Sequence, residues 1–499
     1  MDTFSSSYPY YFLLPLLLLP LLLSMRNNRK GLPPGPPKLP IIGNLHQLGD
    51  LPHRSLWKLS EKYGPIMLLQ FGRKPTLIIS SAEIASEILK THDLNFCHRP
   101  SLVGPKRLSY NCQDIVFGTY GEFWRELRRA CAVELFSLKR VQSFGFVREE
   151  EVAILVKSIS ETSGPINLTE KLFSLTDRIV CRVAFGKSYQ GRDFDDGKFH
   201  DVVYEATKMI GSFAAADFFP YYGWIIDVLS GFNSRLEKVF LSFDTFYQKV
   251  IDEHLDPERK KAEKEDIVDV LLGLQTHDQS GATRLTISQV KGILMNVFIG
   301  GVETSALTMV WTMTELARNP KVMKKVQEEI RNCVGKKGRV EEIYINQLPY
   351  FKMVVKETLR LHPPGPLLVP RECMSHCKIN GYDVYPKTRV LVNAWGIARS
   401  SEYWEKPDEF IPERFQNSSV DFKGQDFEYL PFGSGRRACP GMNMGVATME
   451  VALANLLYCF NWELPSGMKS EDVNIDEKAG ITIHKKVPLH LVPIDYNWQ

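Results

Sequence analysis

The sequence predicts a mainly α-helical protein with a small β-rich part and one membrane-anchoring segment at its N-terminus. Beyond about residue 80, most of the chain has apolar residues at helical spacing, interrupted by prolines. Short runs rich in β-branched residues, glycine and proline lie at 66–80, at 363–392 and near the C-terminus. A leucine-rich stretch of 18 uncharged residues runs from Tyr8 to Met25, which is near the lower length limit for a helix that crosses a bilayer.

The N-terminal stretch favours an uncleaved anchor. The prolines inside it are tolerated better in membrane helices than in soluble ones. Arg26, Arg29 and Lys30 follow it directly, and cations on this side favour a cytosolic location for the rest of the chain. A cleaved signal peptide is the alternative, but Asp2 replaces the positive start that such peptides have.

Composition and charge set the broad class. A hydrophobic share of 44% and a charged share of 24% are ordinary for a globular protein. A net charge of only +3 gives no reason to expect a nucleic-acid-binding protein. Nine dispersed cysteines, an odd number, fit a reducing compartment better than a disulfide framework. We therefore expect an anchor over 1–25, a basic and proline-rich hinge over 26–40, and one globular body over 41–499.

Within the body, the first β element is a hairpin over 66–80, with a turn at Gly72–Pro75. The longest helix is expected from about Ser288 to Asn319, because Thr286 and Gln289 form a capping-box pattern and a proline follows Asn319. Such a helix is roughly 45 Å long.

The same helix is expected to be buried and to contain a pair of glycines near its centre that destabilises it. Glu303 is its one charge between Gly292 and Met313. The adjacent Gly300 and Gly301 cost about 2 kcal/mol relative to alanines. Either a flat ligand lies against the backbone there, or another helix packs closely; the residues alone leave both open. Short strands are then expected within 363–392, at 480–483 and at 488–493.

The most informative segment is a glycine-rich loop, Phe432-Gly-Ser-Gly-Arg-Arg-Ala-Cys439-Pro-Gly441. Its cysteine stands beside two arginines and before a helical stretch, a setting expected to lower a thiol pKa and favour the thiolate. A thiolate is a suitable iron ligand, although a structural cysteine in a turn is the alternative. The overlapping Gly433-x-Gly435-x-x-Ala438 matches a dinucleotide fingerprint, but no βαβ unit surrounds it. Electrons from NADPH would therefore have to come through a partner protein.

Two further patterns contain arginine. Glu357 and Arg360 share one helix face, with Arg414 further along the chain. Trp124 and Arg128 also lie on one face, either as a cation–π surface pair or as part of a carboxylate-binding group, because an arginine fork pairs two oxygens.

Taken in order, these motifs resemble those of the cytochrome P-450 family over essentially the whole chain. The amino-acid sequences of the hinge and of the cysteine loop resemble those of plant microsomal members of the large group that oxidises terpenoids, alkaloids and phenylpropanoids. The resemblance implies a cytochrome P-450 fold with an N-terminal transmembrane anchor and haem b whose iron is ligated by Cys439. It also implies NADPH- and O2-dependent hydroxylation at the cytosolic face of the endoplasmic reticulum, with NADPH–cytochrome P-450 reductase as electron donor and cytochrome b5 as a further candidate partner.

The resemblance also assigns roles to residues. Thr304 assists oxygen activation through its hydroxyl, Glu303 relays protons, and Glu357, Arg360 and Arg414 form a structural network behind the haem. The expected haem contacts are Trp124, Arg128, Arg371, Phe432, Arg437, Gly300 and Gly301. The expected substrate contacts are Phe298, Ile299, Val302, Leu367, Leu368, Val369, Ile481 and Thr482, together with the segment 99–120. An exposed basic face for the electron donor is expected at Arg125, Arg129, Lys139, Arg140 and Arg436, with a plain solvated surface as the alternative.

The motifs leave the outcome of the chemistry open. Relatives with the same motifs desaturate, couple rings or dehydrate oximes, and a haem-binding sensor or carrier without oxygenation is a rival from another class. The identity of the substrate does not follow from the sequence.

Overall fold

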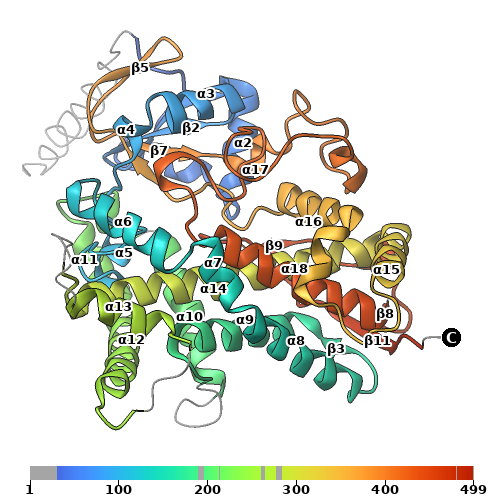
Figure 1. Ribbon diagram of the computed structural model, residues 1–499. Helices are drawn as coiled ribbons and strands as arrows, with labels where there is room; N and C mark the ends of the chain where they lie inside the picture. Colours follow the sequence, from blue (N-terminus) through green and yellow to red (C-terminus); the bar gives the residue numbers. More distant parts are fainter. Residues whose placement is uncertain are drawn as a thin grey trace, which may run out of the picture.

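The computed structural model describes residues 31–188, 196–212, 214–259, 264–276, 284–478 and 480–497. The anchor predicted over 1–25 and the start of the hinge lie outside the described residues. A β-rich part stands at one end of the molecule, and a larger helical part fills the rest (Figure 1).

Most of the described chain is helical. The helices are α2 (Pro52–Tyr63), α3 (Ala82–Ser86), α4 (Asp93–Phe96), α5 (Val103–Leu108), α6 (Glu122–Glu134), α7 (Leu138–Ser143), α8 (Gly145–Ser160), α9 (Leu168–Phe185), α10 (Asp196–Gly211), α11 (Gly223–Leu229), α12 (Phe232–Leu255), α13 (Ile267–Thr276), α14 (Ile287–Arg318), α15 (Pro320–Val334), α16 (Pro349–Leu361), α17 (Ala394–Ile397) and α18 (Met442–Cys459).

The strands form small sheets. They are β1 (Ile66–Phe71), β2 (Lys74–Ile79), β3 (Ile166–Asn167), β4 (Arg371–Glu372), β5 (Cys377–Ile379), β6 (Tyr382–Val384), β7 (Arg389–Val392), β8 (Phe460–Glu463), β9 (Glu477–Lys478), β10 (His484–Lys485) and β11 (His490–Asp495). The largest sheet has the order β1-β2-β7-β4, with β2 and β7 parallel and the other two pairs antiparallel. It joins the N-terminal segment to a segment some three hundred residues later, which places the blue and orange parts side by side in Figure 1.

The predicted hairpin is present, but its turn is tighter than expected. Lys74 and Pro75 belong to β2, opposite Phe71 and Gln70, so the turn is confined to Gly72 and Arg73. Pro75 is tolerated because β7 begins to pair only at Thr76, and a proline cannot donate to a second neighbouring strand.

The predicted long helix is confirmed as α14. Thr286 and Gln289 form the expected capping box, and Asn319 ends the helix. It passes through the centre of the helical part, where it contacts α9, α18, α16 and α12. It is also apolar and long enough to cross a membrane, but 67% of its most apolar window is buried inside the protein. It is therefore a core helix.

The C-terminal strands are only partly where the sequence placed them. Residues 480–483 form no strand; β10 begins at His484 instead and pairs with β9. The run 488–493 falls largely within β11, which pairs with β8 and β3.

Candidate functional site

The cysteine loop leads directly into α18. The backbone N–H of Cys439 donates to the carbonyl of Phe432 over 2.9 Å and closes the loop. Gly433 and Gly435 have φ values of 67° and 70°, and a β-carbon at Gly435 would collide with the carbonyl of Leu89. The glycines therefore allow a backbone turn that other residues adopt only with strain.

The surroundings of the Cys439 thiol both raise and lower its pKa. Burial raises the pKa of Cys439, while the backbone N–H groups of Gly441 and Met442 and the guanidinium of Arg128 lower it only in part. The net direction is upward, so the thiolate expected from the sequence depends on a bound cation as well as on these donors. A bound metal cation deprotonates a coordinating thiol outright.

A largely apolar cavity lies between the cysteine loop and α14; we call it the Cys439 cavity. It encloses about 1080 Å³ of empty space, part of it open to solvent. Cys439, Phe432 and Gly441 line it on one side, and Gly300 and Thr304 line it on the other. Aliphatic side chains complete the wall: Ile115, Val116, Ile179, Val180, Val183, Val297, Leu359 and Met449.

The two glycines of α14 have different surroundings. A β-carbon at Gly301 would lie 2.9 Å from a methyl carbon of Val180 on α9, so this glycine allows two helices to pack closely. Nothing lies within 4 Å of a β-carbon at Gly300, which lines the Cys439 cavity. Close helix packing therefore applies to Gly301. Both glycines line the Cys439 cavity, and the flat ligand against the helix stays a prediction.

The adjacent Glu303 and Thr304 face different places. The Thr304 hydroxyl donates to the Gly300 carbonyl over 2.7 Å, and Thr304 lines the Cys439 cavity. Glu303 is only 3% exposed and bonds His484 in a separate cavity. The structure therefore brings Thr304, but not the carboxylate of Glu303, to the cysteine.

Four arginines gather beside the cysteine loop: Arg99, Arg128, Arg371 and Arg437. We call them the arginine cluster. Burial, together with the positive charges of the others, lowers the pKa of Arg437 to about 10. Burial and the same charges also lower the pKa of Arg99 well below its usual value. Their bonds go mainly to neutral carbonyls: Arg437 donates to Cys97, Val116 and Gly118, and Arg128 to Ala438.

Carboxylates compensate the arginine cluster only in part. Asp93 pairs with Arg371 at 2.8 Å. Burial raises the pKa of Asp114 to about 6, which is still below neutral pH, so this carboxyl is mostly charged there. Two carboxylates then face four guanidiniums. A buried excess of positive charge is costly and is relieved by an anionic ligand.

Sequence reasoning missed one member of the arginine cluster. Arg99 was placed only in a segment expected to contact substrate, yet it donates to Val116, Val369 and Pro370 and is 6% exposed. The Arg99-Pro100 pair gave no sign of this role. The Arg437 guanidinium lies 3.7 Å from the ring centroid of Trp124, which places Trp124 beside the arginine cluster, and its contact with haem stays a prediction.

These features fit a haem. The macrocycle is flat, and the backbone at Gly300 leaves room for a flat group opposite Cys439. A haem carries two propionates, and the arginine cluster supplies the matching positive charge. The thiol at the end of the cavity is a donor that haem iron accepts.

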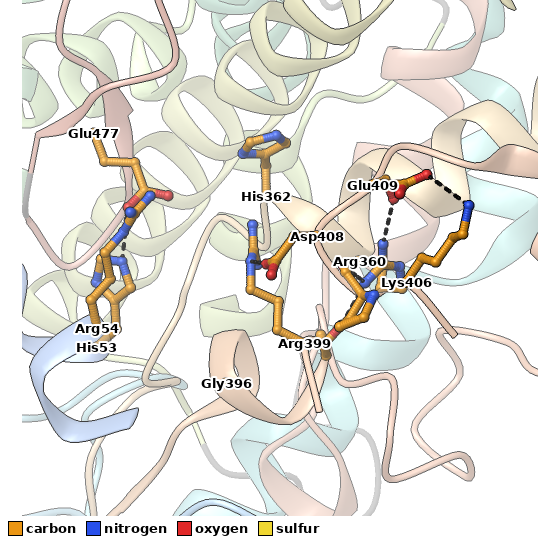
Figure 2. Close-up of polar contacts among 12 residues, drawn as sticks. His53, Arg54, Arg360, His362, Gly396, Arg399, Lys406, Asp408, Glu409 and Glu477 are labelled. Atoms are coloured by element: carbon orange, nitrogen blue, oxygen red, sulfur yellow. Dashed lines mark hydrogen bonds and ion pairs between the residues drawn. The ribbon is translucent and has the colours of Figure 1, made fainter. Parts of the chain in front are cut away.

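Glu357, Arg360 and Arg414 come together as predicted; we call them the Glu357 network. Arg360 makes a two-pronged bond to Glu357 at 2.8 and 2.9 Å, and Arg414 reaches the same carboxylate at 2.9 Å. Figure 2 shows Arg360 beside Glu409 and Lys406, where it also donates to the carbonyl of Glu409. Glu357 and Arg360 are fully buried.

The predicted substrate contacts are placed less simply. Of the eight described residues in that set, none lines the Cys439 cavity. Phe298, for example, is fully buried and stacks on Phe185 at 6.0 Å between ring centroids. Ile115 and Val116, from the predicted segment 99–120, do line it. The role of the eight residues stays a prediction.

Comparisons with known proteins agree with this geometry. A family model described as cytochrome P450 matches residues 33–492. The chain is 52% identical to cytochrome P450 71B37 of Arabidopsis thaliana over 492 residues, covering 98% of each chain. It is 50% identical to cytochrome P450 71B10 of the same plant, over 97% of this chain and 98% of the other. A solved zebrafish cytochrome P450 structure with abiraterone superposes with a TM-score of 0.76 at 26% identity, covering 90% of this chain and 100% of that one.

Proposed function

The chain belongs to the cytochrome P450 family of monooxygenases, and from that premise we propose that it hydroxylates a small, largely apolar plant metabolite at the endoplasmic reticulum membrane. Members of the family carry haem b on a cysteine thiolate and receive electrons from NADPH through a reductase. The observation that carries the proposal is the position of Cys439 and Thr304 on opposite walls of one apolar cavity beside the arginine cluster.

Cys439 is the proposed iron ligand, and the arginine cluster is the proposed partner of the two propionates. Phe432 lines the cavity beside the sulfur and packs edge-on against Phe422 at 5.5 Å. When bound, the haem supplies oxygen activation and the oxidation of a C–H bond. The protein holds the group flat, keeps water away with aliphatic walls and controls protons through α14.

Thr304 is the proposed proton-handling group inside the cavity. Its hydroxyl proton is held by the Gly300 carbonyl, which leaves the oxygen lone pairs free to accept a hydrogen bond from the cavity side. Thr304→Ala should retain haem but release reducing equivalents from NADPH as peroxide. An unchanged product yield per NADPH in this variant would remove the role of the hydroxyl.

The cavity wall favours an apolar substrate. Its lining is dominated by valine, isoleucine and methionine side chains, and a wall of this kind binds through apolar burial with few polar contacts. A terpenoid or an alkaloid fits this chemistry and the group of plant enzymes that the sequence resembles.

A membrane-facing surface supports the proposed anchor over 1–25 and hinge over 26–40. The helix α11 and the turn before it expose apolar side chains, including Tyr221 at 73%, Trp224 at 56% and Leu229 at 81%. Ile41 is 72% exposed, and its segment is joined to this region through bonds from Gly72 to Ile42 and from Arg73 to Phe218. An exposed apolar patch of this size is typical of a membrane contact.

The proposed docking face for the reductase lies on the side of the cysteine loop. Arg125, Arg129 and Lys139 on α6 and α7 are exposed, as is Arg436 in the loop itself. A positive surface here steers an acidic partner towards the shortest path to the haem. Cytochrome b5 is a second candidate for the same surface.

One experiment tests the central assignment. Cys439→Ala should abolish the thiolate signature in the reduced carbon-monoxide spectrum of microsomes, while Cys333→Ala should leave it unchanged, because Cys333 lies far away on α15. Retention of the signature in the Cys439 variant would refute the assignment.

A second experiment defines the reaction. Microsomes containing the protein and a plant reductase receive NADPH and a panel of terpenoids, indole alkaloids and phenylpropanoids. A gain of one oxygen on one class supports hydroxylation or epoxidation and identifies the substrate class. A loss of two hydrogens without oxygen would instead assign desaturation or ring coupling.

A further inference from the structure

Glu303 and Thr304 are neighbours on α14, yet each faces its own cavity. Thr304 lines the Cys439 cavity. Glu303 lines a second cavity of about 500 Å³ of empty space, bounded by α10, α14 and the β9–β10 region. We call it the His484 cavity. The backbone of α14 is thus the wall between the two spaces, and Glu303 is an acid at that wall.

The partner of Glu303 is a histidine from a distant segment. His484 Nε2 lies 2.5 Å from Glu303 Oε1. The imidazole is held from two sides, stacked on Phe173 at 6.0 Å and edge-on to Tyr204 at 5.6 Å between ring centroids. A ring held this way keeps its nitrogen directed at the carboxylate.

The remaining oxygen of Glu303 is buried without a hydrogen-bond partner among the described residues, and so is the hydroxyl of Thr482. Both residues line the His484 cavity. Buried polar atoms of this kind are the usual hosts of bound water. The second cavity is therefore suited to carry water up to the pair.

The His484 cavity also reaches the protein surface. Lys208, Lys478 and Gly480 line it and are exposed, whereas Glu303 is 3% exposed and the His484 side chain 17%. Exposure thus falls from the cavity mouth through His484 to Glu303. His484 is the titratable ring between bulk water and the buried acid.

We propose that His484 supplies Glu303 with protons from solvent, so that the second cavity is the proton entrance of the site. The inference rests on the proposed function, in which Glu303 passes protons towards Thr304. In the step, protonated His484 gives its Nε2 proton to Glu303 Oε1; the N–H bond breaks, an O–H bond forms, and a neutral ring and a carboxylic acid result. The acid side chain turns towards the Thr304 side and releases the proton there, which leaves a carboxylate. A hydronium ion from bulk solvent, entering through the second cavity, then gives its proton to Nε2 and remains as water. No electron is transferred in this step.

His484 is a positioning residue, because it acts through Glu303. The charged and titratable groups that face the ring are Glu303 from α14, Tyr204 and Lys208 from α10 and Lys478 from β9, which pairs directly with His484. A purely structural ion pair would hold α14 to β10 and have no effect on proton supply. Replacing the imidazole with a side chain that does not titrate therefore distinguishes the two roles, because only a role in proton supply would change the product yield and its pH dependence.

The first test uses His484→Gln, which retains a hydrogen-bond donor but does not titrate, and His484→Phe, which retains the stacking on Phe173. Both should show the reduced carbon-monoxide signature of the unchanged protein. With the panel member that the wild type oxidises, product per NADPH should fall roughly ten-fold in both, since a positioned proton donor contributes about 10²- to 10⁴-fold and water replaces part of it. The pH dependence of this yield should flatten. Lys486→Gln, which changes an exposed lysine that does not line the His484 cavity, should leave the yield and its pH profile unchanged.

Wild-type yield and pH profile in both His484 variants would overturn the proposal, and so would a flattened profile in the Lys486 variant alone. A second, substrate-free test is thermal unfolding of His484→Gln, Glu303→Gln and the double variant. The pair predicts that the double variant loses less in Tm than the sum of the two single losses; additive losses would overturn it. Failure of the proposed function is distinct, because the wild type itself would then oxidise no panel member or lack the carbon-monoxide signature.

Discussion

The Glu357 network and the arginine cluster are both built from buried arginines, but their charges are balanced differently. In the network, one carboxylate receives Arg360 and Arg414 directly, and the remaining guanidinium donors reach backbone carbonyls. In the cluster, four guanidiniums face only two carboxylates among the described residues, those of Asp93 and Asp114. A network in which each charged group has its partners within the protein is typical of a structural role. A buried excess of positive charge is typical of a site that binds an anionic ligand.

The largest expected effect on stability comes from a substitution in the Glu357 network. Arg360→Met should destabilise the protein by about 3–5 kcal/mol, because it breaks the fully buried two-pronged ion pair with Glu357 and leaves Arg414 as the remaining guanidinium on that carboxylate. We expect little haem-loaded protein, measured as the yield of the reduced carbon-monoxide signal. Arg107→Met is the matched control, since Arg107 makes the same two-pronged bond to Glu237 with side chains 39% and 47% exposed. That control should cost at most about 1 kcal/mol, and equal losses in the two variants would refute the role of burial.

A second closed network predicts a dependence on pH. Burial alone would raise the pKa of Glu477, but hydrogen bonds from His53 and Arg54, which meet it in Figure 2, lower it to about 2. The folded-state pKa is below the usual 4.5, so the stabilisation is complete above pH 4.5 and is lost as the pH falls towards 2. The shift corresponds to about 3 kcal/mol.

Urea unfolding at a series of pH values measures this loss. Glu477→Gln should remove most of the slope in the pH window from 4.5 to 2. Glu471→Gln, which changes a carboxylate that is 77% exposed on the segment just before β9, should leave the slope in place. An unchanged slope in the Glu477 variant would show that other groups carry the acid sensitivity.

Substitutions in the arginine cluster should affect haem binding more than stability, unlike substitutions in the Glu357 network or at Glu477. Arg99→Gln should lower haem affinity about 10- to 100-fold, in line with the loss of one charge-assisted contact worth about 1.5–3 kcal/mol, with a smaller effect on unfolding of the haem-free protein. Arg331→Gln is the control, because Arg331 is also buried and donates to the carbonyls of Leu457, Tyr458 and Phe460, remote from the cluster. Haem transfer to apomyoglobin measures the affinity. A loss of stability without a loss of haem affinity in the Arg99 variant would show that Arg99 has a structural role like that of the Glu357 network.

The sequence predicted the motif-bearing parts of this site well, for a physical reason. The capping box of α14, the glycines around Cys439 and the pair Glu357–Arg360 are short-range patterns, and their geometry follows from the local chain. The β-rich part was also recognisable, although the strand predicted at 480–483 begins about four residues later, at His484, and the C-terminal strand predicted at 488–493 begins two residues later, at His490.

What the sequence did not reveal depends on contacts between distant segments. The upward shift of the Cys439 pKa arises from burial by several elements, and Arg99 meets Arg437 only because the loops at 97–118 and 432–441 fold together. The pairing of Glu303 with His484 joins residues 181 positions apart. No local spacing encodes such contacts, so no reading of periodicity or propensity could supply them.

The smallest expected effect comes from substituting the exposed arginines of α6, which belong neither to the Glu357 network nor to the arginine cluster. Arg125 and Arg129 lie on the solvent side of α6, the helix that also carries Trp124 and Arg128. Arg125→Glu with Arg129→Glu should leave haem content and stability unchanged, because exposed charges contribute little to either. The KM for the reductase should rise about three- to ten-fold at low salt, and the difference should shrink as salt screens the surface.

Steady-state NADPH-dependent turnover at increasing reductase and salt concentrations measures this effect. Lys321→Glu with Lys324→Glu makes the same change of charge on the exposed face of α15, at the opposite side of Figure 1 from α6. If the two double variants raise the KM equally, net charge rather than a docking face controls the encounter. If only the α6 variant does so, one helix serves two separable purposes, since its buried arginine faces the haem site and its exposed arginines face the electron donor.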